Sequence, residues 1–162
     1  MYGLVSQIFG WALDLFYQRR NTGGPVPATG PIIIVANHPN GLIDPIIIMR
    51  MAGRPVRFLA KEPLFRIPII GWLIRAVGAL PVYRAQDGHD TSANRKMFSA
   101  VEDALSGGDC ICLFPEGISH DEPELQPLKT GAARMALGAE AAHDFRLGLG
   151  IVPIGLHFRE KT

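Results

Sequence analysis

The chain of 162 residues has little cysteine, and this absence limits the class of protein it can be. Cys110 and Cys112 are its two cysteines, and they lie two residues apart in an apolar run. In a strand, such side chains point the same way about 6.6 Å apart, which is poor geometry for a disulfide. A metal site would need further ligands nearby. We therefore predict two packing residues in a reducing compartment.

Other signals are also missing. The sequence has no basic segment followed by a small-residue cleavage site, so we expect no secretory signal. It has no uninterrupted apolar run of about 18 residues, so no segment is a clear transmembrane span. It also lacks the glycine-rich loop of the Walker type and the Rossmann fingerprint.

What is present indicates a globular domain. Its content of 48% hydrophobic and 19% charged residues excludes a disordered chain and allows a sizeable core. Residues 1–84 hold nine Arg and Lys against three Asp and Glu, whereas the remainder holds seven against twelve. The basic half is also the more apolar half. This combination suits an anionic membrane surface better than a nucleic acid, although chance asymmetry also explains it.

Three regions are expected. Residues 1–20 form an amphipathic helix, with apolar residues at spacings of three and four: Leu4, Ile8, Trp11 and Leu15. The aromatic residues and the terminal arginines suit a helix at a membrane interface. The alternative is a helix packed on its own domain or on the rest of a longer protein. Residues 21–30 form a Gly/Pro linker. Residues 31–162 form the main domain, which we expect to be truncated because it ends soon after a strand-like run.

Beyond residue 31, short apolar runs alternate with helical patterns. Strands are predicted at 32–36, 55–60, 79–83, 110–114 and 151–158, and helices at 45–52, 64–77, 92–105 and 129–142. The pattern at 64–77 is interrupted at Pro68, which predicts one or two short helices. This alternation predicts an α/β domain with a mostly parallel sheet flanked by helices.

The segment 37–44, with the sequence NHPNGLID, follows the first strand directly. His38 and Asp44 would lie on different faces of a continuous helix, but the turn-forming residues between them allow the two side chains to meet. A histidine held by a carboxylate can take a proton from an alcohol. The alternative is that Asp44 is only the N-cap of the helix that begins at Pro45.

Polar side chains follow four of the predicted strands. His38, Lys61, Arg84 and Glu116 each come just after a strand end. Ligands of open parallel sheets bind outside the carboxyl ends of the strands. The sequence therefore predicts one site that brings these four residues together.

Four blocks in this order resemble the glycerophosphate acyltransferases of the lysophosphatidate-acyltransferase-like superfamily. The blocks are NHPNGLID (37–44), GALPVYR (78–84), FPEGISH (114–120) and IVPIGL (151–156). Five residues separate His38 from Asp44, where the common pattern has four. This spacing resembles the fungal glycerol-3-phosphate acyltransferase branch. The third block has Ile118, Ser119 and His120 where many members have Thr, Arg and Ser.

The resemblance implies roles for these residues. His38 is expected to be the general base and Asp44 its orienting partner. Arg84 and Lys61 are expected to bind the acceptor phosphate, and Glu116 to order Arg84 or a substrate hydroxyl. Two further residues are counted among the substrate-binding set: Asn37, and Gly117, which allows close backbone approach.

The function implied is that of a membrane-associated O-acyltransferase at the cytoplasmic face, in phospholipid synthesis. The acyl donor would be acyl-CoA or acyl-ACP, used as a co-substrate, with no cofactor, metal or nucleic acid. The acceptor would be glycerol-3-phosphate or 1-acyl-glycerol-3-phosphate. The alternatives are another lipid acceptor or a non-catalytic lipid-binding domain. A metal site around His120 and its acidic neighbours is a further alternative.

Overall fold

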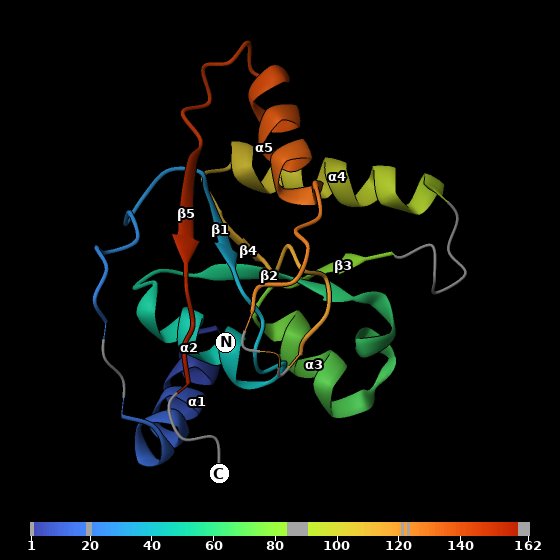
Figure 1. Cartoon of the computed structure of the whole chain (residues 1–162). Coiled ribbons are helices and arrows are strands. Elements are labelled where there is room, and N and C mark those ends of the chain that lie inside the picture. Colours follow the sequence, from blue (N-terminus) through green and yellow to red (C-terminus); the bar gives the residue numbers. More distant parts are fainter. Residues whose placement is uncertain (1, 19–20, 84–90, 121, 123, 159–162) are drawn as a thin grey trace.

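The computed structural model describes residues 2–18, 21–83, 91–120, 122 and 124–158, with no side-chain detail for 91–94 (Figure 1). Within them, five strands form one parallel sheet in the order β3-β2-β4-β1-β5. The strands are β1 (Ile32–Ala36), β2 (Val56–Lys61), β3 (Leu80–Val82), β4 (Cys110–Leu113) and β5 (Gly150–Ile154). The predicted α/β fold with a mostly parallel sheet is therefore confirmed.

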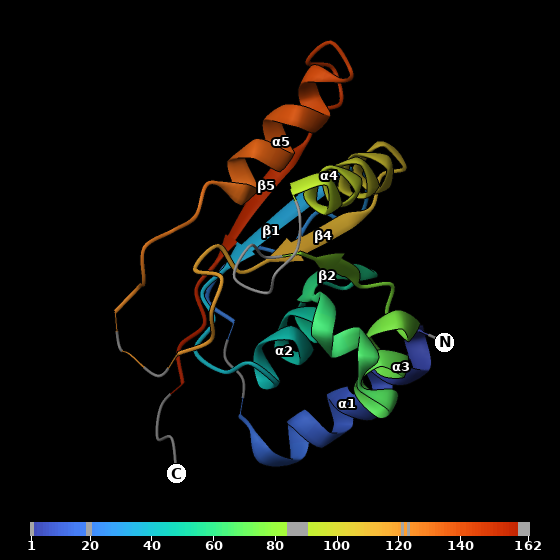
Figure 2. The ribbon, with the colours of Figure 1, turned by 90° about the vertical axis from the view of Figure 1, so that its right-hand side faces the viewer.

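Helices cover both faces of this sheet. They are α1 (Tyr2–Phe16), α2 (Ile43–Met51), the 3-10 helix η1 (Glu62–Arg66), α3 (Pro68–Ala76), α4 (Thr91–Ser106) and α5 (Gly131–Ala141). Figure 2 shows α4 and α5 on one face of the sheet and α1, α2 and α3 on the other. The predicted interruption at Pro68 is confirmed, because η1 ends and α3 begins on either side of Ile67.

The central strand β4 supplies both halves of the core. Ile111 packs in the cluster beneath α4 and α5, whereas Cys110 and Cys112 pack in the cluster on the opposite face. Both thiols are free. Burial raises the pKa of Cys110 to about 11 and that of Cys112 well above its usual value, and the nearby Asp44 charge adds to the second shift. Both cysteines therefore stay protonated at neutral pH, as packing residues should.

Helix α1 is shorter than predicted, because residues 17 and 18 are not helical. It buries Val5 and Leu13 against the domain, and its Asp14 carboxylate lies 3.6 Å from the Arg50 guanidinium of α2. The predicted apolar stripe faces outward, with Trp11 76% exposed. Thus α1 both packs on its own domain and presents an apolar face. No helix in the described ranges has the length and apolar character needed to cross a bilayer.

Candidate active site

The loop after β1 turns the chain into α2 through Asn40. Its side-chain carbonyl accepts hydrogen bonds from the backbone N–H groups of Leu42 and Ile43, at 3.3 and 3.2 Å. These bonds satisfy donors that the start of a helix leaves open. The interpretation of Asp44 as the N-cap is wrong, because the N-cap position of α2 is Leu42 and Asp44 lies inside the first turn.

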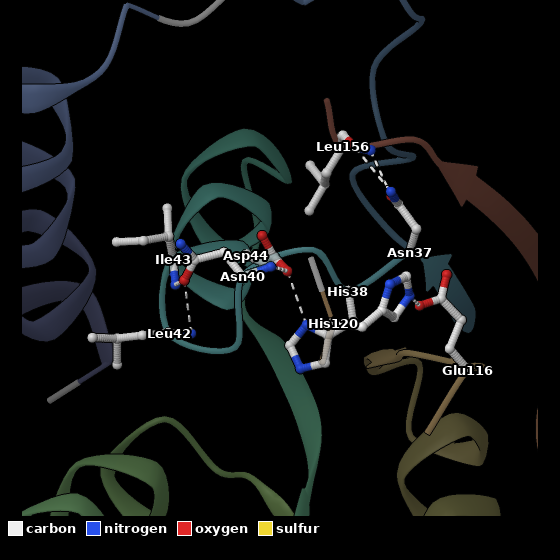
Figure 3. A network of polar contacts seen from close by, with 9 residues as sticks. All are labelled: Asn37, His38, Asn40, Leu42, Ile43, Asp44, Glu116, His120 and Leu156. Atoms are coloured by element: carbon white, nitrogen blue, oxygen red, sulfur yellow. Dashed lines mark hydrogen bonds and ion pairs between the residues drawn. The ribbon is translucent and has the colours of Figure 1, made fainter. Parts of the chain in front are cut away.

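Asp44 instead points back at His38 (Figure 3). Its Oδ2 lies 2.9 Å from His38 Nδ1 and also accepts the backbone N–H of Asn40 at 2.7 Å. The Asp44 side chain is fully buried, and its Oδ1 has no hydrogen-bond partner among the described residues. The predicted meeting of His38 and Asp44 is confirmed.

The imidazole of His38 is fixed in a second way. Its ring stacks on that of Phe114, with centroids 3.8 Å apart and an angle of 9° between the planes. In a neutral imidazole, the Nδ1 hydrogen that bonds to the carboxylate leaves the lone pair on Nε2. Unlike Asp44 Oδ1, His38 Nε2 is not buried without a partner. The His38 side chain is 16% exposed. The arrangement therefore presents a proton acceptor to the solvent side of the site.

A second histidine–carboxylate pair lies next to the first. His120 Nε2 contacts Glu116 Oε2, and the Glu116 side chain is fully buried (Figure 3). The backbone N–H of His120 donates to the carbonyl oxygen of His38 at 3.2 Å. Sequence reasoning missed this pair, although the spacing of four residues between Glu116 and His120 was a signal for it.

The described residues give no support to the metal interpretation of His120, and Asp121, one of the acidic neighbours that it includes, lies outside them. No group of three or more His, Cys, Asp or Glu side chains in the described ranges is placed to hold a metal ion. The imidazole is instead engaged by Glu116. The predicted contact of Glu116 with Arg84 stays a prediction, since Arg84 lies outside the described residues.

The other predicted site residues are placed as follows. Asn37 holds the end of β1 to the segment after β5: its amide donates to the Leu156 carbonyl at 2.9 Å and accepts the Leu156 N–H at 2.6 Å. These bonds occupy the amide that was expected to face substrate. Lys61 is the exposed last residue of β2 rather than the residue after it. Gly117 has a positive φ of 74°.

A cavity of ≈ 450 Å³ opens beside the two pairs. Its lining includes Asn37 and Glu116, and most of the other lining residues are apolar, from β1, β5 and the loop before α5: Val35, Ala36, Leu125, Leu128, Pro153 and Ile154. The site thus combines a proton acceptor, buried carboxylates and an adjoining apolar space.

Comparisons with known proteins agree with this arrangement. The chain is 29% identical over 245 aligned residues to an uncharacterized acyltransferase of Schizosaccharomyces pombe, covering 98% of the chain and 36% of that protein. It is 49% identical over 69 residues to glycerol-3-phosphate O-acyltransferase 2 of Saccharomyces cerevisiae, covering 43% of the chain and 9% of that protein. The chain thus spans about a third or less of the length of these relatives.

The fold matches a solved structure. The crystal structure of the 1-acyl-sn-glycerophosphate acyltransferase PlsC from Thermotoga maritima superposes with a TM-score of 0.68 at 19% identity, covering 99% of the chain and 71% of that protein. A family model described as Acyltransferase matches residues 19–157, which is most of the chain. The chain belongs to this acyltransferase family.

Proposed function

We propose that this chain carries the active site of an O-acyltransferase that moves a fatty acyl group from a thioester to a hydroxyl of a glycerol-phosphate acceptor. The observation that carries the proposal is the 2.9 Å contact between His38 Nδ1 and Asp44 Oδ2, which leaves Nε2 open. Two relatives support the acceptor class, because one is named for glycerol-3-phosphate and the other for 1-acyl-sn-glycerophosphate.

The mechanism follows from that geometry. Nε2 of His38 takes the proton of the acceptor hydroxyl while its oxygen attacks the thioester carbon. The tetrahedral intermediate then collapses with loss of the C–S bond, and the departing thiolate takes the proton from the imidazolium. Asp44 holds the ring and stabilises the imidazolium that forms between these steps. A direct transfer of this kind uses no acyl-enzyme.

The substrate-binding roles are also proposed. Lys61 and Arg84 would bind the acceptor phosphate, and Glu116 and Gly117 would shape the acceptor side of the site. The apolar cavity beside Asn37 suits the start of a fatty acyl chain. The donor would be acyl-CoA or acyl carrier protein, and the proposed chemistry needs no cofactor.

The activity is tested with a radiolabelled acyl-CoA offered to glycerol-3-phosphate and to lysophosphatidate in parallel reactions. We expect label in a phosphorylated lipid product with at least one acceptor, and none with His38→Ala. Labelled product at the wild-type rate from His38→Ala would refute the base assignment. Absence of transfer by the wild-type chain to either acceptor would refute the acceptor class.

We further propose that α1 and α3 rest on the cytoplasmic face of a membrane. Large apolar side chains are exposed on both helices: Leu4, Ile8, Trp11 and Leu15 on α1, and Ile69 and Trp72 on α3. Figure 2 shows both helices on the same face of the sheet. Aromatic and aliphatic side chains gathered on a surface helix favour the lipid interface.

Vesicle binding tests this orientation with a matched pair of variants. Leu4 of α1 and Leu137 of α5 are almost equally exposed, at 63% and 64%, but lie on helices that cover opposite faces of the sheet. We expect Leu4→Gln to weaken co-sedimentation with anionic vesicles and Leu137→Gln to leave it unchanged. Equal losses, or no loss with Leu4→Gln, would contradict the proposed orientation.

A further inference from the structure

Lys129 is held beside the loop that carries Glu116. Its backbone N–H donates to the Pro115 carbonyl at 2.8 Å, which joins the end of the β4–α5 connection to its beginning. Its side chain lies over Gly117: a Cβ built on Gly117 would lie 2.6 Å from Lys129 Nζ and 3.0 Å from Cε. The amine therefore occupies space that any other residue at position 117 would fill.

Gly117 serves this placement in two ways. Its φ of 74° lies in the region that residues with a side chain rarely adopt. Its missing Cβ also leaves room for the lysine amine. We had expected Gly117 to admit a close approach to the backbone, and in this structure the group that approaches it is Lys129.

Among the residues that the structure describes, the Lys129 amine has no charged partner. Across the ranges that the structure describes, no side-chain hydrogen bond involves this amine either, and Lys129 is an exposed residue. A lysine that only stabilised the loop would be expected to contact a carboxylate or a carbonyl oxygen. The amine is instead positioned and left available to a ligand.

The loop that holds this amine also contacts the proposed base. His120, three residues after Gly117, donates its backbone N–H to the His38 carbonyl at 3.2 Å. A Cβ on Gly41 would lie 3.4 Å from the Ser119 side chain, so the two loops are packed together. The loop beside the Lys129 amine is therefore in contact with the loop that carries the proposed base.

We propose that Lys129 binds a phosphate group of a substrate, and that Gly117, which has no side chain, leaves the space in which the Lys129 amine lies. An ammonium group offers three donors and a full charge to phosphate oxygens. The identity of the ligand rests on the proposed function. The phosphate can belong to the glycerol-phosphate acceptor or to the nucleotide part of the acyl-CoA donor.

Steady-state kinetics test the contact with Lys129→Met, which keeps most of the apolar stem. We expect the KM for the substrate that carries the phosphate to rise about tenfold, since a hydrogen bond to a charged group contributes that much. The matched control is Lys96→Met, which removes an exposed lysine of α4. Lys129→Arg should restore most of the affinity, because it keeps the charge.

Two donors separate the possible sources of the phosphate. A higher KM for glycerol-3-phosphate, seen with both acyl-CoA and acyl-pantetheine, assigns the contact to the acceptor. A higher KM for acyl-CoA alone, absent with acyl-pantetheine, assigns it to the nucleotide of the donor. Wild-type KM values for every substrate in Lys129→Met would overturn the proposal.

The variant Gly117→Ala tests whether the space at Gly117 is needed for phosphate binding by Lys129. The added methyl group must displace the amine, so the KM should rise when Lys129 is present and should not rise further in the double variant with Lys129→Met. Additive effects would show that Gly117 does not act through Lys129. Thermal unfolding of each variant reports any loss of folding. The Lys129→Met experiment tests the proposal even if Gly117→Ala fails to fold.

A binding measurement separates this inference from the proposed function. Glycerol-3-phosphate, added without a donor, should raise the unfolding temperature of the wild-type chain and of Lys96→Met but not of Lys129→Met; if only acyl-CoA gives this pattern, the donor is the source. Phosphate-dependent protection in a chain without transferase activity would refute the function and keep the site. Normal turnover with unchanged protection and KM in Lys129→Met would refute the site alone.

Discussion

The two histidine–carboxylate pairs at the carboxyl edge of the sheet are built alike but leave opposite ring nitrogens free. In both, the carboxylate is fully buried and the histidine is slightly exposed. His38 uses Nδ1, and its remaining Nε2 is not enclosed. His120 uses Nε2, and its remaining Nδ1 is enclosed without a partner among the described residues. A carboxylate beside a histidine therefore does not by itself indicate catalysis.

The difference also separates the two tasks. The nitrogen that His38 leaves open can reach a substrate, whereas the enclosed nitrogen of His120 cannot do so in this arrangement. His120 instead joins its loop to the first pair, through its backbone N–H and the His38 carbonyl. We interpret the second pair as a positioning element for the first. Substitutions in both pairs test this difference.

The largest expected effect is that of His38→Ala. Loss of a general base lowers a rate by about 10²- to 10⁴-fold, so the kcat of His38→Ala should fall by a factor of this size. The thermal unfolding curve should stay close to that of the wild type. His120→Ala, measured beside it with the same labelled donor, should keep kcat within about tenfold. Equal losses in the two variants would remove the distinction between the pairs.

Asp44→Asn should have the next largest effect. The amide cannot orient Nδ1–H and stabilise the imidazolium as the carboxylate does, so kcat should fall by about 10²-fold or more. The KM for the acceptor should change little, because Asp44 is buried behind His38. A variant that loses affinity for the acceptor but keeps kcat would show that Asp44 acts on binding instead.

Glu116→Gln should affect stability more than chemistry. A buried hydrogen-bonded carboxylate that loses its charge weakens its contact with His120, which costs about 1–3 kcal/mol of unfolding free energy. Urea denaturation measures this loss, and kcat should fall less than in Asp44→Asn. A fall in kcat as large as that of Asp44→Asn in a chain of normal stability would contradict the positioning role.

Asn40→Ala should have the smallest effect. Loss of the two bonds from its side chain to the start of α2 costs about 1 kcal/mol, as for other helix caps. The matched control is Asn21→Ala, which removes a single bond to Gly23 in the exposed linker. Unfolding in urea should detect the first change and not the second. Equal stability of the two variants would contradict the capping role of Asn40.

Sequence reasoning anticipated the elements better than their contacts. Short apolar runs predicted each strand, with ends shifted by a few residues, as in β5. The turn between His38 and Asp44 was also predictable, because Pro39, Asn40 and Gly41 favour a change of direction. Local chemistry was sufficient in these cases, since each depends on residues close together in the chain.

Other features were beyond such reasoning. Helix α1 has apolar residues on both sides, so its periodicity did not show that Val5 and Leu13 would be buried and Trp11 exposed. The bonds between Asn37 and Leu156 join residues 119 positions apart. Neither the buried side of α1 nor the Asn37–Leu156 bonds can be read from neighbouring residues, because both depend on how distant segments pack together.

The sequence by itself determined the alternation of strands and helices, the turn that brings His38 to Asp44, and the family of the chain. These follow from turn chemistry, periodicity and ordered motifs, all of which act over short stretches. Only the tertiary structure decided the strand order and the pairing of His120 with Glu116. It also decided which nitrogen of His38 stays accessible and where the Lys129 amine lies over Gly117. These depend on side-chain packing between distant segments, which determines where each polar atom is buried.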